Sequence, residues 1–331
     1  MSLRDRNVLV TGGAGYIGSH AVLALQEAGA RVSVVDNLVT GFRWAVDDNA
    51  AFFEADIGDG AAVTEILEKQ EIQSVLHFAG SVVVPESVSD PLKYYRNNTA
   101  NTRTLLEAAV SHGIEDFIFS STAAVYGTPS VSQVCETTQT VPINPYGTSK
   151  LMTEMMLADV AQAHPLRYAA LRYFNVAGAD LKMRTGQSTK GATHLIKVAV
   201  QTALGRRDKM AMFGTDFDTV DGTGVRDYIH VSDLVSAHVA ALEHLVSGQD
   251  KALTMNLGYG RGASVKQVID TVEKVTGLAV AHEAAPRRAG DPGELVSDVS
   301  KLKETLNWTP SHDDLNVIVQ TAFDWEKRLN H

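Results

Sequence analysis

Short apolar runs alternate with segments of helical periodicity through the first half of the 331-residue chain. Several of these runs are apolar at nearly every position, as strands are when helices cover both faces of their sheet. The alternation predicts an α/β fold of the Rossmann type, with a doubly wound parallel sheet. The predicted strands span residues 7–13, 31–36, 51–56, 74–80, 116–121 and 168–174, and the predicted helices lie near residues 16–28, 60–70, 98–112 and 146–163.

The pattern changes after about residue 176. The segment "GADLKMRTGQSTKGA" is polar and contains glycine, which indicates a loop at a domain boundary. We therefore expect a first domain over residues 1–176 and a smaller C-terminal α/β lobe over residues 177–331, with some late segments returning to the first domain. Helical patterns in the lobe recur near residues 191–205, 232–247, 264–276 and 313–329.

A glycine-rich turn follows the first predicted strand. The segment "VLVTGGAGYIGSH" places Gly13, Gly15 and Gly18 in a G-x-G-x-x-G pattern that opens a helix. Glycines let the backbone approach a pyrophosphate, which a helix N-terminus stabilises. Asp36 ends the second strand, where a carboxylate can accept hydrogen bonds from a ribose diol and would repel a 2′-phosphate. A turn that only packs helix on strand is the alternative, but the strand–helix–strand context favours a dinucleotide site with NAD rather than NADP.

Other strand ends should open into the same crevice, because ligands bind at the carboxyl ends of strands in open α/β sheets. Small residues after the fourth strand leave room for a cofactor, and an acid follows the third strand. Each of these residues taken alone more often has a structural role. The candidates are Asp56, Ile57, Phe78, Ala79, Gly80 and Asn97.

The segment "NPYGTSK" predicts a catalytic pair. Asn144 can cap a helix and Pro145 suits its first turn. Tyr146 and Lys150 then lie about 5–6 Å apart on one helix face. A phenol titrates near ~10, but an adjacent ammonium lowers its pKa, as a bound nicotinamide cation would. The result is a general base suited to an alcohol. Most Tyr-x-x-x-Lys pairs are only part of an amphipathic helix, but the dinucleotide motif favours the catalytic interpretation here.

A hydroxyl donor should complete this set. The segment "FSSTAAVYG" places Ser120, Ser121 and Thr122 at the end of a buried strand, which opens into the ligand crevice. Thr122 could share a hydrogen bond with a substrate hydroxyl and shorten the proton path to Tyr146. A threonine that ends a strand is otherwise ordinary.

Together these residues resemble the extended short-chain dehydrogenase/reductase family, and within it the NAD-dependent epimerases that invert C4 of a UDP-hexose. The resemblance covers nearly the whole chain and includes "VTGGAGYIGSH", "DNLVTG", "HFAG", "PLKYYRNN", "SSTAAVYG", "NPYGTSK", "LRYFNVAGA", "DGTGVRDYIHV" and "RAGDP". It implies that the first domain binds NAD and the lobe a UDP-sugar. It also implies a homodimer paired through the helices near 98–112 and 146–163, and a catalytic set of Thr122, Tyr146 and Lys150.

The resemblance implies two sets of binding residues. The predicted cofactor contacts are Gly12, Gly15, Tyr16, Ile17, Gly18, Asp36, Asn37, Asp56, Ile57, Phe78, Ala79, Gly80, Asn97, Ser120, Tyr146, Lys150 and Tyr173. The predicted substrate contacts are Thr122, Tyr146, Asn175, His194, Leu195, Phe213, Arg226, Arg288, Asp291 and Leu295. Their chemistry is suitable, because two arginines can bind a diphosphate and a phenyl ring can face a uracil.

Three positions depart from the pattern of many relatives. Val82 stands where they have a lysine that touches the cofactor, so Ser81 or Lys150 should carry more of that polar contact. His194 stands where asparagine is common. Leu295 occupies the position that faces the C2 substituent of the sugar. Tyrosine there crowds an N-acetyl group, so a leucine of intermediate size predicts turnover of UDP-GlcNAc and UDP-GalNAc as well.

Two other functions remain as alternatives. NDP-sugar 4,6-dehydratases place Asp-Glu directly after the threonine, and decarboxylating relatives place a glutamate in this segment. Here those positions hold Ala123 and Ala124, whose methyl groups cannot transfer protons. A catalytically silent NAD(H)-sensing regulator is the alternative from another class, and the intact Thr122, Tyr146 and Lys150 argue against it.

Composition narrows the remaining classes. The formal net charge of −10 disfavours nucleic acid or an anionic membrane as a partner. Cys135 is the single cysteine, so no internal disulfide can form; we expect it to be inert and the protein to be cytoplasmic. The sequence predicts neither a secretory leader nor a membrane span. The eleven histidines are scattered, which argues against a metal site, and His77, His230 and His238 are interpreted as packing or hydrogen-bonding residues.

Overall fold

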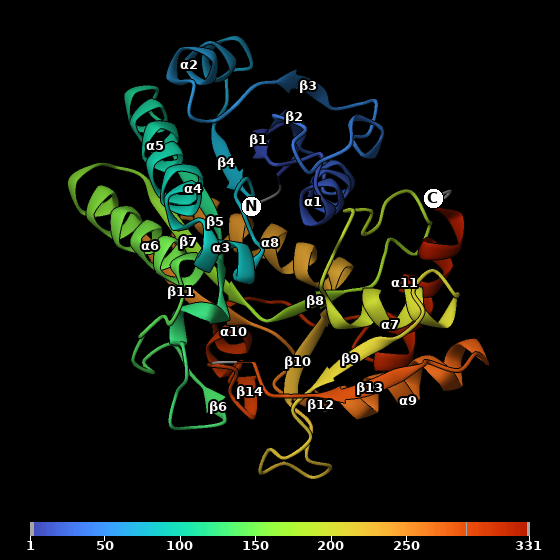
Figure 1. Cartoon of the computed structure of the whole chain (residues 1–331). Coiled ribbons are helices and arrows are strands. Elements are labelled where there is room, and N and C mark those ends of the chain that lie inside the picture. Colours follow the sequence, from blue (N-terminus) through green and yellow to red (C-terminus); the bar gives the residue numbers. More distant parts are fainter. Residues whose placement is uncertain (1–2, 289, 330–331) are drawn as a thin grey trace.

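A seven-stranded parallel sheet forms the centre of the molecule in this computed structural model, which describes residues 3–288 and 290–329 (Figure 1). The strand order β11-β7-β5-β4-β1-β2-β3 reverses direction between β1 and β4, as in doubly wound folds. The strands are β1 (Asn7–Thr11), β2 (Arg31–Asp36), β3 (Ala51–Glu54), β4 (Ser74–His77), β5 (Asp116–Thr122), β7 (Arg167–Tyr173) and β11 (Ala252–Leu257).

Helices cover both faces of this sheet because its strands are apolar on both sides. Val8 and Val10 point into a core formed with α1 (Tyr16–Glu27) and α8 (Val231–Val246). Leu9, between them, points the other way, into a core formed with α2 (Gly60–Lys69), α5 (Asn101–Ser111) and α6 (Pro145–Ala163). This period-two alternation confirms the predicted α/β class.

The six predicted strands and four predicted helices of the first half are all present. The helix predicted from residue 98 begins at Asn101, because a π-helical segment, η2 (Tyr95–Ala100), precedes it. Short helices α3 (Val84–Ser89) and α4 (Pro91–Tyr94) lead into this segment. Single-turn π segments frequently mark functional sites. Two 3₁₀ turns, η1 (Arg43–Ala45) and η3 (Ala123–Tyr126), complete this half.

Two smaller sheets, together with several helices, form the second half (Figure 1). One runs in the order β12-β10-β14-β6, with β8 also paired to β10, and the other pairs β13 with β9. The strands are β6 (Gln133–Val134), β8 (Asn175–Ala177), β9 (Met210–Phe213), β10 (Val225–His230), β12 (Gly262–Ser264), β13 (His282–Ala285) and β14 (Glu294–Ser297). The helices are α7 (Leu195–Ala203), α9 (Val265–Thr276), α10 (Ser300–Thr305) and α11 (Leu315–Arg328).

Two late segments pack against the first half: β11 adds a strand beside β7, and α8 contacts α1. The division into domains at residue 176 stays a prediction.

A buried carboxylate joins three parts of the second half. Asp227 on β10 is 0% exposed and accepts hydrogen bonds from the backbone N–H groups of Tyr259 and Gly260, each at 3.0 Å. The Ser297 hydroxyl on β14 donates to the same carboxylate. Asp227 therefore fixes β14 and the turn after β11 relative to β10.

Candidate active site

The N-terminus of α6 sets the position of Tyr146. The Asn144 side chain accepts a hydrogen bond from the Gly147 N–H at 2.9 Å and caps the helix. Only glycine fits at position 147, because a Cβ there would lie 2.6 Å from the Ala124 carbonyl oxygen. The missing methyl group lets α6 approach η3, the turn that directly follows Thr122, so that Tyr146 lies beside the carboxyl end of β5.

Lys150 reaches the same strand end. Its ammonium donates a hydrogen bond to the Ser120 carbonyl oxygen at 2.9 Å and lies 4.9 Å from the centre of the Phe119 ring. Lys150 is 3% exposed, and Tyr146 and Thr122 are also buried. The structure therefore brings the three predicted catalytic residues together at the end of β5.

Burial controls the ionisation of this pair. It raises the pKa of Tyr146, while the Thr122 hydroxyl acts in the opposite direction. Burial lowers the pKa of Lys150 to about 8, and the Glu154 carboxylate opposes that change. For the protein's own groups burial raises the pKa of Tyr146 overall, and the lowering of that pKa by Lys150 stays a prediction. Further positive charge at the phenol is needed before it can act as a base near neutral pH.

The burial of Lys150 predicts a specific pH dependence of stability. Between about pH 8 and 10.5 the unfolded chain still holds the lysine proton that the folded protein has lost, so unfolding becomes less favourable as pH rises. The free energy of unfolding of the wild type, relative to Lys150→Met, should rise by about 3 kcal/mol across this window. Denaturant titrations of both proteins at pH 7 to 10.5 measure it, and a constant difference would contradict the burial of a charged amine.

Two further aromatic side chains lie near Tyr146. Tyr94, fully buried on α4, packs edge-on against the Tyr146 ring with centroids 6.4 Å apart. Tyr173 ends β7 and hydrogen-bonds the Ser120 hydroxyl. Burial raises the pKa of both phenols above the ordinary value, so both are neutral. Tyr94 was not predicted as a site residue, because its position depends on the π segment that follows it.

The glycine turn has the shape of a dinucleotide cradle. Gly12 has φ +70, and a Cβ there would lie 2.7 Å from the Ala79 nitrogen, while a Cβ on Gly18 would lie 2.1 Å from the Gly12 oxygen. Gly15 caps α1 without a side-chain hydrogen bond from any described residue, and the first turn has no acid. The first N–H groups of α1 are therefore suited to an anionic phosphate.

Asp36 lies beside this turn, as predicted. Its carboxylate accepts hydrogen bonds from the backbone N–H groups of Ala14 at 3.0 Å and Leu38 at 2.8 Å. Burial nevertheless raises its pKa. The side chain is 8% exposed and fixed between the glycine turn and the loop after β2. The chemistry of this set fits a dinucleotide with an unmodified ribose diol.

The other predicted cofactor residues lie at neighbouring strand ends. The Asp56 carboxylate accepts hydrogen bonds from the Asn37 amide at 2.8 Å and the Asn101 amide at 2.9 Å. The side chain of Ile57 is buried in the core, so only the backbone of Ile57 is free for a cofactor contact. The Tyr16 hydroxyl donates a hydrogen bond to the Gly178 carbonyl at 2.7 Å. Ile17 and Phe78 pack partly against the core.

The loop after β4 connects the cofactor cradle to the catalytic pair. A Cβ on Gly80 would lie 2.9 Å from the Asn98 side-chain oxygen and 3.8 Å from the Lys150 amine. Asn98 accepts from the Ser81 N–H at 2.7 Å and donates to the Ser149 hydroxyl at 3.0 Å. The Asn97 amide donates to the Ser81 hydroxyl at 3.0 Å. Asn97 was predicted as a cofactor contact, whereas Asn98, which joins this loop to α6, was not predicted.

Val82, in the same loop, is 53% exposed. The stronger polar role predicted for Ser81 or Lys150 stays a prediction.

The predicted substrate residues form two groups around β10. Asn175 on β8 lies opposite Tyr228, and Leu295 on β14 lies opposite Arg226. The Arg226 guanidinium forms an ion pair with the Asp291 carboxylate at 3.0 Å, so Arg226 also has a structural role. Leu295 is buried in a small cluster that also contains Ala123, the residue that follows Thr122. This arrangement connects the C-terminal lobe with the end of β5.

The second group contains an arginine stacked on a ring. The Arg288 guanidinium lies 3.9 Å from the centre of the Phe213 ring at the end of β9. His194 and Leu195 open α7, and the ring nitrogen Nδ1 of His194 lies 2.7 Å from the side-chain nitrogen of Gln187. Roles for these residues in substrate binding stay predictions.

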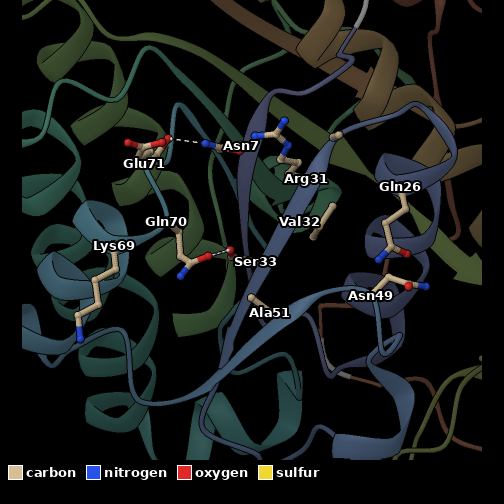
Figure 2. A pocket seen from close by; sticks show the side chains of 11 residues that line it. Asn7, Gln26, Arg31, Val32, Ser33, Asn49, Ala51, Lys69, Gln70 and Glu71 are labelled. Atoms are coloured by element: carbon tan, nitrogen blue, oxygen red, sulfur yellow. Dashed lines mark hydrogen bonds between the residues drawn. The ribbon is translucent and has the colours of Figure 1, made fainter.

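A separate polar pocket of about 670 Å³ lies at the amino ends of β1, β2 and β3 (Figure 2). Figure 2 shows Asn7, Arg31 and Ser33 on the strands and Lys69 and Gln70 at the end of α2. The described lining includes none of the predicted site residues, which gather at the carboxyl ends of the strands. We assign this pocket no part in the chemistry.

Hydrogen bonds hold both ring nitrogens of His77 and of His230. His238 uses only Nδ1, near the Leu234 carbonyl, and its Nε2 is buried without a partner among the described residues. His77 lies 2.7 Å from the Thr11 hydroxyl and 2.8 Å from the Thr102 hydroxyl, and His230 lies 3.0 Å from the Thr321 hydroxyl. Within residues 3–288 and 290–329, no group of three or more acidic, histidine or cysteine side chains could hold a metal ion. Over the same ranges, none of the helices has the length and apolar character needed to cross a membrane.

Comparison with known proteins agrees with this geometry. Residues 8–258 match the NAD dependent epimerase/dehydratase family, and the chain belongs to that family. The UDP-glucose 4-epimerase of Azospirillum brasilense is 56% identical over 97% of this chain and 92% of its own length. The crystal structure of UDP-glucose 4-epimerase from Brucella ovis in complex with NAD has a TM-score of 0.94 at 46% identity, covering 96% of this chain and 98% of that one.

A relative named for two UDP-sugars has about the same sequence identity to this chain as the Brucella ovis protein. The UDP-Glc/GlcNAc 4-epimerase of Campylobacter jejuni is 47% identical, with a TM-score of 0.87, and the match covers 98% of this chain and all of that one.

Proposed function

We propose that the protein is an NAD-dependent UDP-glucose 4-epimerase, which interconverts UDP-glucose and UDP-galactose. The reaction oxidises the sugar at C4, the 4-keto sugar rotates within the site, and hydride then returns to its other face. The observation that carries the proposal is the meeting of Tyr146, Lys150 and Thr122 at the end of β5, beside a loop that also contacts the glycine cradle. The family and the full-length relatives support the same activity.

The chain's own groups divide the work of this reaction. When bound between the glycine turn and Lys150, NAD supplies the hydride acceptor and donor. Tyr146 removes the proton of the sugar 4-hydroxyl and later returns it, and the Thr122 hydroxyl holds that oxygen in line. Lys150, fixed by the Ser120 carbonyl, supplies positive charge near the phenol. The buried position of all three residues excludes water from the proton path.

The C-terminal lobe supplies an anchor that is the same for both sugars. Arg226 and Arg288 provide cations for the diphosphate of an otherwise acidic protein, and Phe213 provides a flat face for the uracil. Ala123 and Ala124, directly after Thr122, leave that segment without the acid and base that dehydration requires. Leu295 shares a small buried cluster with Ala123 and has intermediate bulk, which supports turnover of N-acetylated UDP-hexoses as well.

Purified protein incubated with UDP-galactose tests the proposed function. UDP-glucose should form without added cofactor, and enzyme-bound NAD should be recovered after denaturation. Parallel incubations with UDP-GalNAc and with a UDP-uronic acid define the range of sugars. Absence of UDP-glucose with retained NAD would point to the NAD(H)-sensing regulator instead. Strict rejection of the N-acetyl sugars would contradict the role of Leu295.

We also propose a homodimer in the cytoplasm. The lone Cys135 suits a reducing compartment, and α6 exposes Met152 and Met155. Placing a charge in this apolar patch should dissociate the dimer, so Met155→Lys should convert a species of about twice the chain mass into a monomer. Light scattering after size exclusion measures the mass. Leu278→Lys, an exposed site beyond α9, is the control, and a monomeric wild type would contradict the proposed assembly.

A further inference from the structure

A buried ion pair lies directly behind the catalytic lysine. Glu154 follows Lys150 by one helical turn on α6 and is 7% exposed. Arg172 on β7 donates to its carboxylate from Nε at 3.0 Å and from Nη2 at 2.6 Å. Buried pairs of this kind are costly to desolvate, and apolar replacements are often at least as stable. The pair therefore calls for a role beyond stability.

The same carboxylate reaches the catalytic strand. The Ser121 hydroxyl on β5 donates to Glu154. Ser121 lies between Ser120, whose carbonyl receives the Lys150 ammonium, and Thr122. Ser121 also lies opposite Arg172 in the β5–β7 register. Glu154 thus links the neighbouring strands β5 and β7 to α6 at the point where the reacting groups converge.

A second layer fixes the arginine. Arg172 also donates from Nη1 to the Tyr126 hydroxyl at 3.0 Å, and that hydroxyl donates to the Asn256 side chain at 2.7 Å. Tyr126 and Asn256 are 1% and 0% exposed. The guanidinium cannot leave Glu154 without breaking this buried chain of hydrogen bonds.

Charge around the lysine comes from few groups. Burial holds the His77 pKa at about 3 and raises the pKa values of Tyr146 and Tyr173, so these three side chains are neutral. β5 contributes the Ser120 carbonyl and the Phe119 ring to the lysine. The titratable and charged groups around Lys150 and Glu154 are His77 on β4, Tyr94 on α4, Tyr146 on α6, and Tyr168, Arg172 and Tyr173 on β7. Burial raises the pKa of Tyr168 as well, so this phenol is also neutral.

We propose that Glu154 is a positioning residue for the proposed epimerase reaction, with two linked effects. Through Ser121 it holds the end of β5 against α6, and from one turn away its negative charge keeps the Lys150 amine protonated. Glu154 does not touch the sugar; it acts through Lys150 and Thr122. The inference rests on the proposed function and adds a residue outside the Thr122–Tyr146–Lys150 set.

The pH profile of turnover separates the two effects. Glu154→Gln removes the charge and should move the alkaline limb of kcat for UDP-galactose down by about one pH unit, with KM nearly unchanged. Ser121→Ala keeps the charge but loses the strand contact, so it should lower kcat without moving the limb. Glu154→Asp should restore the limb. A purely structural Glu154 would instead give losses that are independent of pH and follow the melting temperature.

A second measurement does not depend on activity. Glu154→Gln leaves a buried guanidinium unpaired, so the double variant Glu154→Gln/Arg172→Met is made as well, in which both charges are removed. Each of these two variants is compared with the same variant that also carries Lys150→Met. The difference in unfolding free energy between the two members of each pair should begin to rise at a lower pH than the difference between the wild type and Lys150→Met. Alkaline limbs and stability profiles that coincide with those of the wild type would overturn the proposal. An inactive wild type would overturn the proposed function, and the stability profiles would still decide the role of Glu154.

Discussion

Replacing Tyr146 by phenylalanine should lower kcat for UDP-galactose by roughly 10²- to 10⁴-fold, the range typical of a lost general base. The phenol lies beside the Thr122 hydroxyl at the end of β5, and phenylalanine removes its oxygen while keeping its ring against Tyr94. Because the glycine cradle and Asp36 are untouched, bound NAD should be retained. Coupled detection of UDP-glucose and absorbance of cofactor released on denaturation measure the two quantities.

The control for this variant is Tyr94→Phe, which removes a neighbouring phenol that hydrogen-bonds the Val83 carbonyl and Glu86 instead. It should keep most of the turnover. Equal losses in the two variants, or unchanged turnover in Tyr146→Phe, would show that the phenol of Tyr146 is not the base.

Among the proposed substitutions, Asp227→Ala should cause the largest loss of stability, because it removes a buried carboxylate. The free energy of unfolding should fall by about 3–5 kcal/mol. The substitution leaves the N–H groups of Tyr259 and Gly260 and the hydroxyl of Ser297 without their buried acceptor. Each orphaned donor costs about 1–3 kcal/mol, less whatever relaxation recovers. Chemical denaturation followed by circular dichroism gives the free energy of unfolding.

Two substitutions calibrate this result. Asp218→Ala removes an exposed carboxylate from the nearby loop and should change stability by less than about 0.5 kcal/mol. Asp227→Asn keeps the shape and one acceptor oxygen, so it should fall between the other two variants. A loss for Asp227→Ala no larger than that for Asp218→Ala would show that the second half does not depend on this carboxylate.

Hydrophobic patterning predicted the parallel sheet because each core strand is apolar on both faces. Val8, Leu9 and Val10 show why: neighbouring residues point to opposite cores, so the run contains no polar position. The glycine turn and the "NPYGTSK" segment were predictable for a similar reason, since their chemistry depends on local spacing. Tyr146 and Lys150 share a face through helical geometry alone.

The supporting residues of the site could not be predicted in this way. Asn98, Glu154 and Arg172 acquire their roles from contacts between elements that are distant in sequence, and each would suit an ordinary helix or strand. The direction of the Tyr146 pKa change also depended on burial, which local spacing does not reveal. The small strands of the second half are short and partly exposed, so their periodicity was too weak to predict them individually.

The position of β11 has a consequence for how the chain is made. Its six residues pair with Tyr168–Tyr173 of β7, yet they are synthesised some eighty residues after that strand. Until the ribosome has released residue 257, β7 is paired only with β5, so the nascent sheet ends in an open edge, which is a template for joining another chain. A fragment that stops near residue 176 should therefore aggregate rather than fold, and protection of this edge during translation is a requirement built into the topology.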